Sequence, residues 1–425
     1  MTKKLKNVPE LRFPEFNEDW NERTISDSIK ILKSGLSREL STTDIGLPVI
    51  RANNLQNYNL VLDDIKYWFK EDPKGAKTEN YYLKKNDILV NFINSEAKMG
   101  TSCIIKSDFK RDTIYTTNIL RYVTKEAYDS YFHYIYTQTY NYKKWIKIIT
   151  KPAVNQASFT TIDFKKIPYY IPEFNEQKKI GDFFSKLDRQ IELEEQKLAK
   201  LEEQKKGYMQ KIFLQELRFK DENGNDYPEW KHETLNELNC YFTDGNYGEG
   251  YPKSDDMSNF EEGVAFLRGS NLKKGRIVLD NANYISKEKH NELVSGHLYL
   301  GDIVIAVRGS LGAVGYVEKN IEGQNINSQL AIIRTLDTKI VSRFLIYYLM
   351  SNFGQKELLS KVSGTALKQL PLKEIKSFKT PLPENKEQDK ISDFFNKLDK
   401  IINKQIKKID GLKLRKKVFL QKMFV

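Results

Sequence analysis

The sequence predicts an α+β protein in which two similar mixed α/β domains are joined by two long antiparallel helices that form a coiled coil. Three observations support this fold class: a duplicated helix, a looser repeat between the regions that precede the two helices, and an apolar period of about 3.5 residues in each helix. The chain has 425 residues, which is more than one hydrophobic core usually serves. We therefore expect two domains related by a pseudo-twofold axis.

The duplicated helix is the clearest of these features. The segment at 179–191 reads KIGDFFSKLDRQI and returns at 390–402 as KISDFFNKLDKII, with 9 of 13 positions identical and a shift of 211 residues. The triplet LRF occurs at 11–13 and again at 217–219, just after the first helix. The order is therefore globular region, helix, globular region, helix. The predicted boundaries are 1–172, 173–214, 215–383 and 384–425.

The two globular regions resemble each other more loosely. The segment PVIRANNL (48–55) parallels AFLRGSNL (265–272), because both place an arginine and a polar turn after an apolar strand. The segments LKKNDILVNF (83–92) and LYLGDIVIAV (298–307) both place an aspartate before an apolar, β-branched run, which is typical of a strand. We infer two diverged copies of one domain.

Each long helix carries a narrow apolar stripe whose steps alternate between four and three residues. In both helices the stripe is interrupted by a polar residue at the same two steps, which we call polar stations. They are Glu194 and Lys205 in the first helix and Gln405 and Lys416 in the second. Such a stripe is typical of a coiled-coil seam, in which shared polar stations can fix the register. The alternative is two separate amphipathic helices that pack only on their own domains. The residues expected to pair are Ile180, Phe184, Leu187, Ile191, Leu198, Leu201, Tyr208, Ile212, Ile391, Phe395, Leu398, Ile402, Ile409, Leu412, Phe419 and Met423.

Chain direction sets the expected orientation. The first helix must lead from one domain to the next, so the second must return antiparallel to pair along its whole length. Helices of this length span roughly 50 Å at ~1.5 Å per residue. The expected object is a ring with one domain at each end of a rod.

Composition narrows the class of protein. No run of eighteen apolar residues occurs, and the lysine-rich N-terminus lacks the apolar stretch of a secretory signal. Only Cys103 and Cys240 are present, which excludes a disulfide framework and fits the cytoplasm. Lys and Arg outnumber Asp and Glu by 69 to 57, a net charge of +12 that favours a polyanionic partner such as nucleic acid.

Catalytic and metal-binding motifs are mostly missing. The sequence has no phosphate-binding loop, no dinucleotide fingerprint and no metalloprotease helix, and its four histidines lack ligand spacing. The glycine-rich stretch 244–252 is interpreted as a surface loop. Asp87 followed by Glu96 and Lys98 resembles the metal-binding core of nucleases, but the second copy, at Asp302, lacks the Glu-x-Lys part. We therefore predict no catalytic residue and no metal ligand.

Two unlike domains held at a fixed separation would suit a split, asymmetric DNA site with an unread spacer. Base contacts require forked or amide side chains in loops, with Arg on guanine and Asn or Gln on adenine as common pairs. The alternative for each candidate is a hydrogen bond to loop backbone or a contact with phosphate. The candidate DNA-binding residues are Arg51, Asn53, Asn54, Asn94, Lys98, Asn118, Lys151, Asn155 and Gln156 in the first domain, and Arg268, Ser270, Asn271, Arg308, Ser310, Gln329, Lys368 and Gln369 in the second.

This arrangement resembles the specificity subunits of type I restriction–modification systems, in which two target-recognition domains are separated by two repeated helical regions. The match is carried by PEFNEQKKIGDFFSKLDRQI, its echo PENKEQDKISDFFNKLDKII, and the two LRF openings. The resemblance implies a chain without catalytic activity that binds double-stranded DNA and docks two modification subunits on its paired helices. It also implies S-adenosylmethionine on those methyltransferase partners, and ATP and magnesium on a separate restriction subunit.

Two other functions remain open at this point. A coiled-coil adaptor whose globular ends bind protein or carbohydrate predicts no affinity for duplex DNA. A fused nuclease that uses Asp87 and Glu96 predicts metal-dependent cleavage by the purified chain.

Overall fold

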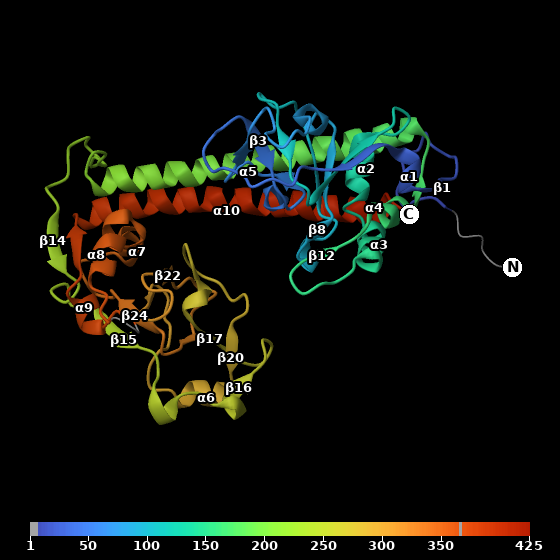
Figure 1. The fold of residues 1–425 in the computed structure, drawn as a ribbon. Coiled ribbons are helices and arrows are strands. Elements are labelled where there is room, and N and C mark those ends of the chain that lie inside the picture. Colours follow the sequence, from blue (N-terminus) through green and yellow to red (C-terminus); the bar gives the residue numbers. More distant parts are fainter. Residues whose placement is uncertain (1–6, 365–367) are drawn as a thin grey trace. The chain divides into compact units, whose positions relative to one another are not determined.

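The chain folds into two compact units. The computed structural model describes residues 7–364 and 368–425. Unit 1 holds the described residues up to Glu195 together with Lys407–Val425, and unit 2 holds Gln196–Ile406. The two long helices, α5 (Phe174–Phe213) and α10 (Asn385–Lys422), each contribute one part to each unit (Figure 1). The compact units therefore divide both helices, whereas the predicted boundaries kept each helix whole.

Unit 1 is built around an antiparallel sheet of four strands in the order β2-β11-β7-β9, beside a three-stranded sheet in the order β10-β3-β6. Two-stranded pairs β1-β13, β12-β8 and β4-β5 complete it. Its strands are β1 (Asn21–Thr24), β2 (Ile29–Ser34), β3 (Leu47–Ile50), β4 (Leu55–Gln56), β5 (Asn59–Leu60), β6 (Lys66–Trp68), β7 (Ile88–Asn91), β8 (Ile93–Asn94), β9 (Ser102–Ile104), β10 (Ile114–Tyr115), β11 (Ile119–Thr124), β12 (Ala157–Ser158) and β13 (Pro168–Ile171). Its short helices are α1 (Ile25–Ser28), α2 (Ser130–Tyr136), α3 (Tyr140–Ile149) and α4 (Thr161–Lys165).

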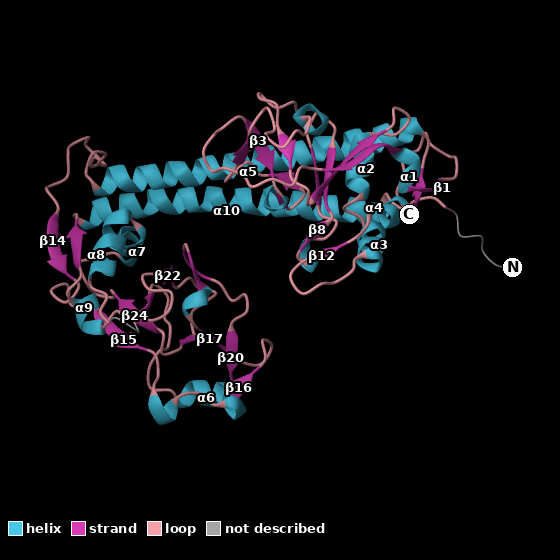
Figure 2. Ribbon diagram, viewed as in Figure 1, coloured by secondary structure: helices cyan, strands magenta, loops and turns pink. Residues whose placement is uncertain are grey.

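Unit 2 has a six-stranded sheet in the order β15-β24-β21-β22-β19-β18, a four-stranded sheet in the order β16-β20-β17-β23, and the pair β14-β25. Its strands are β14 (Lys231–Thr234), β15 (Tyr241–Asp244), β16 (Met257–Ser258), β17 (Val264–Leu267), β18 (Leu272–Lys273), β19 (Gly275–Ile277), β20 (Asn283–Ile285), β21 (Ile303–Ala306), β22 (Val314–Tyr316), β23 (Asn325–Ile326), β24 (Leu330–Arg334) and β25 (Lys379–Leu382). Its short helices are α6 (Lys287–Glu292), α7 (Ser342–Met350), α8 (Asn352–Ser360) and α9 (Leu372–Lys376), and Figure 2 shows α7 and α8 between the long helices and the strands.

The central strand of each unit is buried on both faces, which explains its nearly continuous apolar sequence. In unit 1, Ile88 and Val90 of β7 face the cluster that includes α2, while Leu89 faces a second cluster with β3. In unit 2, β21 repeats the pattern, because Ile303 and Ile305 belong to one cluster and Val304 and Ala306 to another. The predicted repeat of a mixed α/β domain is confirmed.

The two LRF triplets have the same structural role. Arg12 donates from Nε and Nη2 to the Glu176 carboxylate, both at 2.7 Å, and Arg218 contacts Glu387 in the same way at 3.1 and 2.7 Å. The two glutamates lie in the first turn of α5 and α10 and are buried. Each arginine thus ties the chain segment before its domain to the start of that domain's long helix.

Within each unit α5 and α10 lie side by side and run in opposite directions (Figure 1). In unit 1, Phe183 packs on Phe419 with ring centroids 5.0 Å apart, and Glu195 pairs with Lys413 at 2.6 Å. In unit 2, Tyr208 packs on Phe394 at 5.1 Å. The predicted pair of long antiparallel helices is confirmed.

The predicted stripe residues lie in three settings. Leu187, Ile191, Leu412 and Phe419 form a cluster between the helices, and Ile402 and Ile409 are buried. Ile180, Phe184 and Met423 join the core of unit 1, while Ile212, Ile391, Phe395 and Leu398 join that of unit 2. Leu198 and Leu201 are half-buried, and Tyr208 is 39% exposed. The ends of the stripe therefore pack on the domains as well as on the partner helix, so both interpretations of the stripe describe part of it.

Two of the polar stations take part in repeated ionic triads. In unit 1, Asp188 pairs with Lys416 at 2.7 Å and accepts a hydrogen bond from the Tyr131 hydroxyl at 2.9 Å. In unit 2, Asp399 pairs with Lys205 at 2.7 Å and accepts from Tyr347 at 2.8 Å. Each triad joins both long helices to a helix of the adjoining domain, which fixes the register of all three elements.

The ends of the two long helices complete the cores of the units. In unit 1, Phe424 lies against the rings of Trp20, Phe132 and Phe184. In unit 2, Phe213 lies against Trp230, Phe344 and Phe395. Among the described residues, no helix is both long and apolar enough to cross a membrane.

Candidate nucleic-acid interface

The same polar turn follows β3 in unit 1 and β17 in unit 2. In unit 1, Arg51 donates its backbone N–H to Asn54 Oδ1 at 2.9 Å, and Asn54 Nδ2 donates to the carbonyls of Val61 and Asp63. In unit 2, Arg268 and Asn271 repeat the contact at 3.0 Å. Because the amide links the residue that opens the turn to a backbone segment further along the chain, the turn has the same hydrogen bonds in both copies.

This geometry corrects two of the predicted DNA-binding residues. Asn54 and Asn271 are 2% and 0% exposed, and both ends of each amide are already hydrogen-bonded within the turn. A contact with a base is not compatible with these positions. The neighbouring Asn53 and Ser270 are both exposed and stay in the candidate set.

The arginine that opens each turn is held on one side only. Arg51 Nη2 contacts the Asp64 carboxylate at 2.6 Å, which holds the pKa of Asp64 below its usual value, and Arg268 Nη2 donates to the Asn281 carbonyl at 3.2 Å. The Nε of each arginine is buried and has no hydrogen-bond partner among the residues that the structure describes. In both diverged copies, therefore, one terminal nitrogen of the arginine is hydrogen-bonded within the unit while its Nε is not.

Six of the nine candidates in unit 1 line one hollow of about 400 Å³. Its walls come from the polar turn, β8, the segment after β10 and the loop before β12. The hollow contains three basic side chains and no acidic one, so an anion or a base edge would meet donors from all sides. The candidates that line it are Arg51, Asn53, Asn94, Lys98, Asn118 and Gln156.

The loop that carries the remaining unit 1 candidates is closed by a backbone bridge between Lys151 and Ser158, with N–H to O distances of 2.8 and 3.1 Å. Strand β12 pairs with β8, which places Ala157 opposite Asn94. Lys151, Asn155 and Gln156 are all exposed on this loop.

Unit 2 gathers its candidates around the loop that follows β21. Arg308 donates its backbone N–H to the Gln329 carbonyl at 3.2 Å and lies opposite Gln369 in a backbone bridge. Ser310 is 3.4 Å from the position that a Cβ on Gly269 would occupy, so this loop touches the polar turn that holds Ser270. Gln369 pairs with Ser363, and Lys368 beside it is exposed.

Sequence reasoning missed several residues at the two faces. Ser37, Arg38, Thr116 and Thr117 also line the hollow of unit 1. Arg38 contacts Asp72 through Nε at 3.1 Å, which holds the pKa of Asp72 well below its usual range. In unit 2, Tyr247 lies beside Arg308. Part of the glycine-rich stretch 244–252 is an exposed loop as predicted, and Tyr247 is 44% exposed in it.

The usable sequence signal for these residues is a glycine in each copy. A Cβ on Gly35 would lie 2.0 Å from the Tyr115 carbonyl oxygen, and one on Gly245 would lie 2.0 Å from the Asn327 carbonyl oxygen. Such a close backbone approach needs glycine. It brings the residues that follow, Ser37 and Tyr247, to the site.

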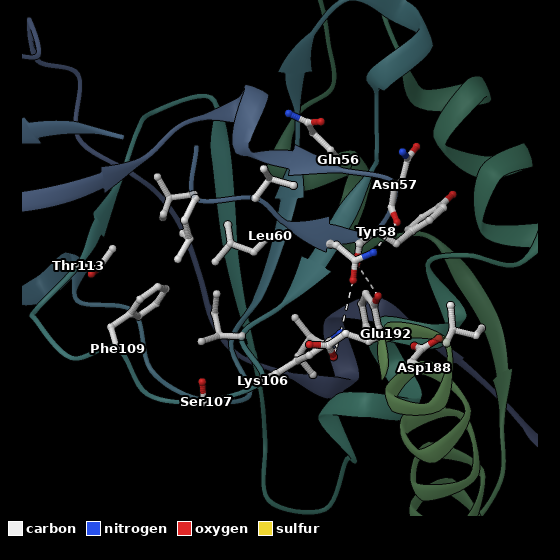
Figure 3. Close-up of a pocket in the computed structure, with 18 of the residues that line it drawn as sticks. Gln56, Asn57, Tyr58, Leu60, Lys106, Ser107, Phe109, Thr113, Asp188 and Glu192 are labelled. Carbon is white, nitrogen blue, oxygen red and sulfur yellow. Dashed lines mark hydrogen bonds and ion pairs between the residues drawn. The ribbon is translucent and has the colours of Figure 1, made fainter. Parts of the chain in front are cut away.

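A larger groove of about 1340 Å³ lies elsewhere in unit 1, between the β4–β5 hairpin, the loop after β9 and the long helices (Figure 3). It contains none of the predicted DNA-binding residues. Its wall is largely apolar, and Lys106 there pairs with Glu192 at 3.6 Å and donates to Asn59 at 3.4 Å (Figure 3). Its lining mixes four acidic with six basic side chains, whereas the charged residues that line the smaller hollow are all basic, so the smaller hollow is the better surface for a polyanion.

Asp87, the aspartate of the nuclease-like pattern, has a structural role. Its carboxylate accepts from Arg121 Nε at 2.6 Å and from the Lys84 backbone, and burial raises its pKa. Asp302 makes the equivalent pair with Arg334 at 2.7 Å in unit 2. Since the copy without Glu-x-Lys keeps this aspartate, the pair explains its presence without a metal ion.

Comparison with known proteins identifies the repeated unit. A family model described as the type I restriction modification DNA specificity domain matches residues 17–203 and, a second time, residues 209–410. The chain belongs to this family. As a type I specificity subunit it carries two DNA specificity domains, one for each copy of the repeat, and the resemblance noted from the two helical segments is confirmed.

Relatives of this specificity subunit span the whole chain. It is 28% identical over 423 residues to the putative type I restriction enzyme MjaX specificity subunit of Methanocaldococcus jannaschii, covering 97% of this chain and 95% of that protein. The MjaVIII specificity subunit of the same organism is 24% identical over 432 residues, covering 97% and 94%. The crystal structure of the S subunit from M. genitalium has a TM-score of 0.63 at 18% identity, covering 98% of this chain and 99% of that chain, which supports the fold.

Proposed function

We propose that this specificity subunit is the DNA-reading component of its complex and carries no catalytic centre of its own. In this proposal, the polar face of each unit reads one half of a split, asymmetric site. The supporting observation is that the same turn, held by Asn54 in unit 1 and by Asn271 in unit 2, carries different exposed side chains in the two copies. A common scaffold with unlike readers suits two unlike half-sites separated by bases that are not read.

The proposed partners follow from the family. Two modification subunits, which bind S-adenosylmethionine, would dock on the specificity subunit and methylate the site. A restriction subunit that uses ATP and magnesium would join through them. The charged outer faces of α5 and α10, and the basic C-terminal turns of α10, suit such protein contacts better than a buried core.

The long helices are proposed to set the spacer between the half-sites. One turn of helix, about four residues, lengthens a helix by ~6 Å, which is close to two base-pair steps of ~3.4 Å. Inserting four residues into α5 should therefore lengthen the unread spacer and leave the bases in both half-sites unchanged. A variant with the same insertion in α10 as well serves as a control for the pairing of the two helices.

The test maps methylated adenines in genomic DNA modified by the complex of the full chain and its modification subunits. Duplex binding by that complex should also fall steeply between low and moderate salt, since phosphate contacts release counterions. An insertion that alters the bases but not the spacer would contradict the spacing role. A complex without affinity for duplex DNA would favour the adaptor function, and cleavage lost on changing Glu96 would favour the nuclease.

A further inference from the structure

Positions that are the same in both units and positions that differ have different expected roles. The DNA backbone is the same in every half-site, and contacts with it carry no sequence information. The turn arginines Arg51 and Arg268 are the same in both copies and suit a backbone contact. Residues that read unlike half-sites should instead differ between the copies.

The strand register identifies the positions that differ. Ile93 and Arg308 both lie six residues after the aspartate that opens the central strand, Asp87 or Asp302. Ser37 and Tyr247 both lie two residues after the close-packed glycine. Unit 1 therefore has serine and isoleucine where unit 2 has tyrosine and arginine.

In unit 2 these two residues form one structure. The Arg308 guanidinium carbon lies 5.2 Å from the centre of the Tyr247 ring. Arg308 Nη1 donates to the Ser328 carbonyl at 3.2 Å, and the Tyr247 hydroxyl donates to the same oxygen at 3.1 Å. The ring and the carbonyl together fix the orientation of an otherwise flexible side chain.

Arg308 has no direct ion-pair partner among the described residues, and the Asp244 carboxylate near it acts on the Tyr247 hydroxyl. Most arginines of the chain pair with a carboxylate, as Arg334 does with Asp302. Across residues 7–364 and 368–425 no carboxylate forms an ion pair with Arg308, which is exposed. An exposed guanidinium without an ion pair contributes little to stability. Because its orientation is already fixed, it is preorganised to bind a ligand.

We propose that Arg308 reads a guanine in the half-site bound by unit 2 and that Tyr247 is its positioning residue. The proposal rests on the proposed function, because it requires duplex DNA at this face. Guanine presents O6 and N7 side by side in the major groove, and a planar guanidinium matches both acceptors. A phosphate contact would not need this orientation, since a flexible lysine supplies a point charge equally well.

The experiment compares variants of the full chain in complex with its modification subunits. The methylated motif is mapped for each variant, and binding is measured on duplexes that carry each base at each motif position. R308K keeps the charge but loses the fork, so it should lower discrimination at one guanine by roughly tenfold to a hundredfold while retaining affinity. Y247A should relax the same position, and Y247F should retain part of the discrimination that Y247A loses.

R268A provides the contrast, because the shared arginine should weaken binding to all duplexes and leave the motif unaltered. The half-site read by unit 1 reports that each variant is folded. The proposal is overturned if R308K leaves every position unchanged, if the relaxed position is not a guanine, or if Y247A discriminates as the unaltered chain does. Failure of the unaltered complex to bind any duplex would overturn the proposed function instead.

Discussion

Replacing Phe424, two residues after the end of α10, should destabilise unit 1 as much as a change in the middle of a core. Residues just beyond a helix end often make few contacts. Here the Phe424 side chain is only 8% exposed and lies 5.3 to 6.2 Å, between ring centres, from Phe132, Phe184 and Trp20. The helix that carries it is also held by a hydrogen bond from the Leu11 N–H to the Lys422 carbonyl at 2.8 Å.

The expected magnitude follows from this burial. Core Phe→Ala changes cost about 3–5 kcal/mol. Since Phe424 lies beyond the end of α10, where the backbone can relax into the space, F424A should cost about 3 kcal/mol, at the lower end. F213A removes the equivalent ring from unit 2 and should cost at least as much, because the residues on both sides of Phe213 belong to that unit.

Denaturant unfolding followed by tryptophan fluorescence measures this loss, since Trp20 touches Phe424 and Trp230 touches Phe213. Hydrogen exchange in β7 and β21 assigns the loss to unit 1 or unit 2. Q421A, an exposed change three residues away, is the matched control and should shift stability by less than about 0.5 kcal/mol. If F424A and Q421A unfold at the same denaturant concentration, the C-terminal ring is not part of the core.

Three further perturbations test other parts of the structure. D399N should lower the free energy of unfolding by about 1–2 kcal/mol, because Lys205 loses its partner. The double variant D399N/K205M should recover part of that loss, and additive effects of the two changes would contradict the triad. Burial lowers the pKa of His133 from 6.5 to about 4, so the imidazole of the unfolded chain binds a proton before that of the folded chain as the pH falls. About 3 kcal/mol of stability should therefore be lost between pH 7 and 4. H133N should flatten this dependence of stability on pH, and an unchanged dependence would exclude His133 as its source. G245A should destabilise the chain by about 2–3 kcal/mol, because its Cβ would clash with a backbone carbonyl. G207A, where a Cβ meets nothing within 4 Å, should instead stabilise the chain by about 0.5–1 kcal/mol. Equal changes in melting temperature for the two variants would refute the packing argument.

Local sequence patterns were sufficient to predict the long helices and the duplicated domains. The alternation of four- and three-residue steps predicts helices at 173–214 and 384–425, and the structure has them at Phe174–Phe213 and Asn385–Lys422. The apolar runs after Asp87 and Asp302 likewise predict the two central strands. In both cases the pattern depends only on residues that are close together in the sequence.

Contacts between distant segments were not predictable in the same way. The stripe places Tyr208 in the seam, where its ring does pack on Phe394, but the side chain stays 39% exposed. The neighbouring Met209, which the stripe omits, is buried in the core of unit 2 because the domain packs on the helix from the side. Asn54 and Asn271 have the residue type of a base reader, but only the structure shows that backbone groups on both sides already occupy their amide hydrogen bonds. Gly245 signals a close backbone approach two residues before Tyr247, but nothing in the local sequence predicts the contact of Tyr247 with Arg308, 61 positions further along the chain.

The way α10 completes unit 1 has a consequence for the order in which the protein is made. Unit 2 consists of one uninterrupted stretch, Gln196–Ile406, so its core can close before the segment Lys407–Val425 is made. Unit 1 begins earlier in the sequence but lacks the ring of Phe424 until all of unit 2 has been synthesised. Nascent multidomain chains generally fold from the N-terminal domain onward. Of these two units, the one that emerges first should be the last to mature, and during that interval its open apolar side is the part most in need of a chaperone.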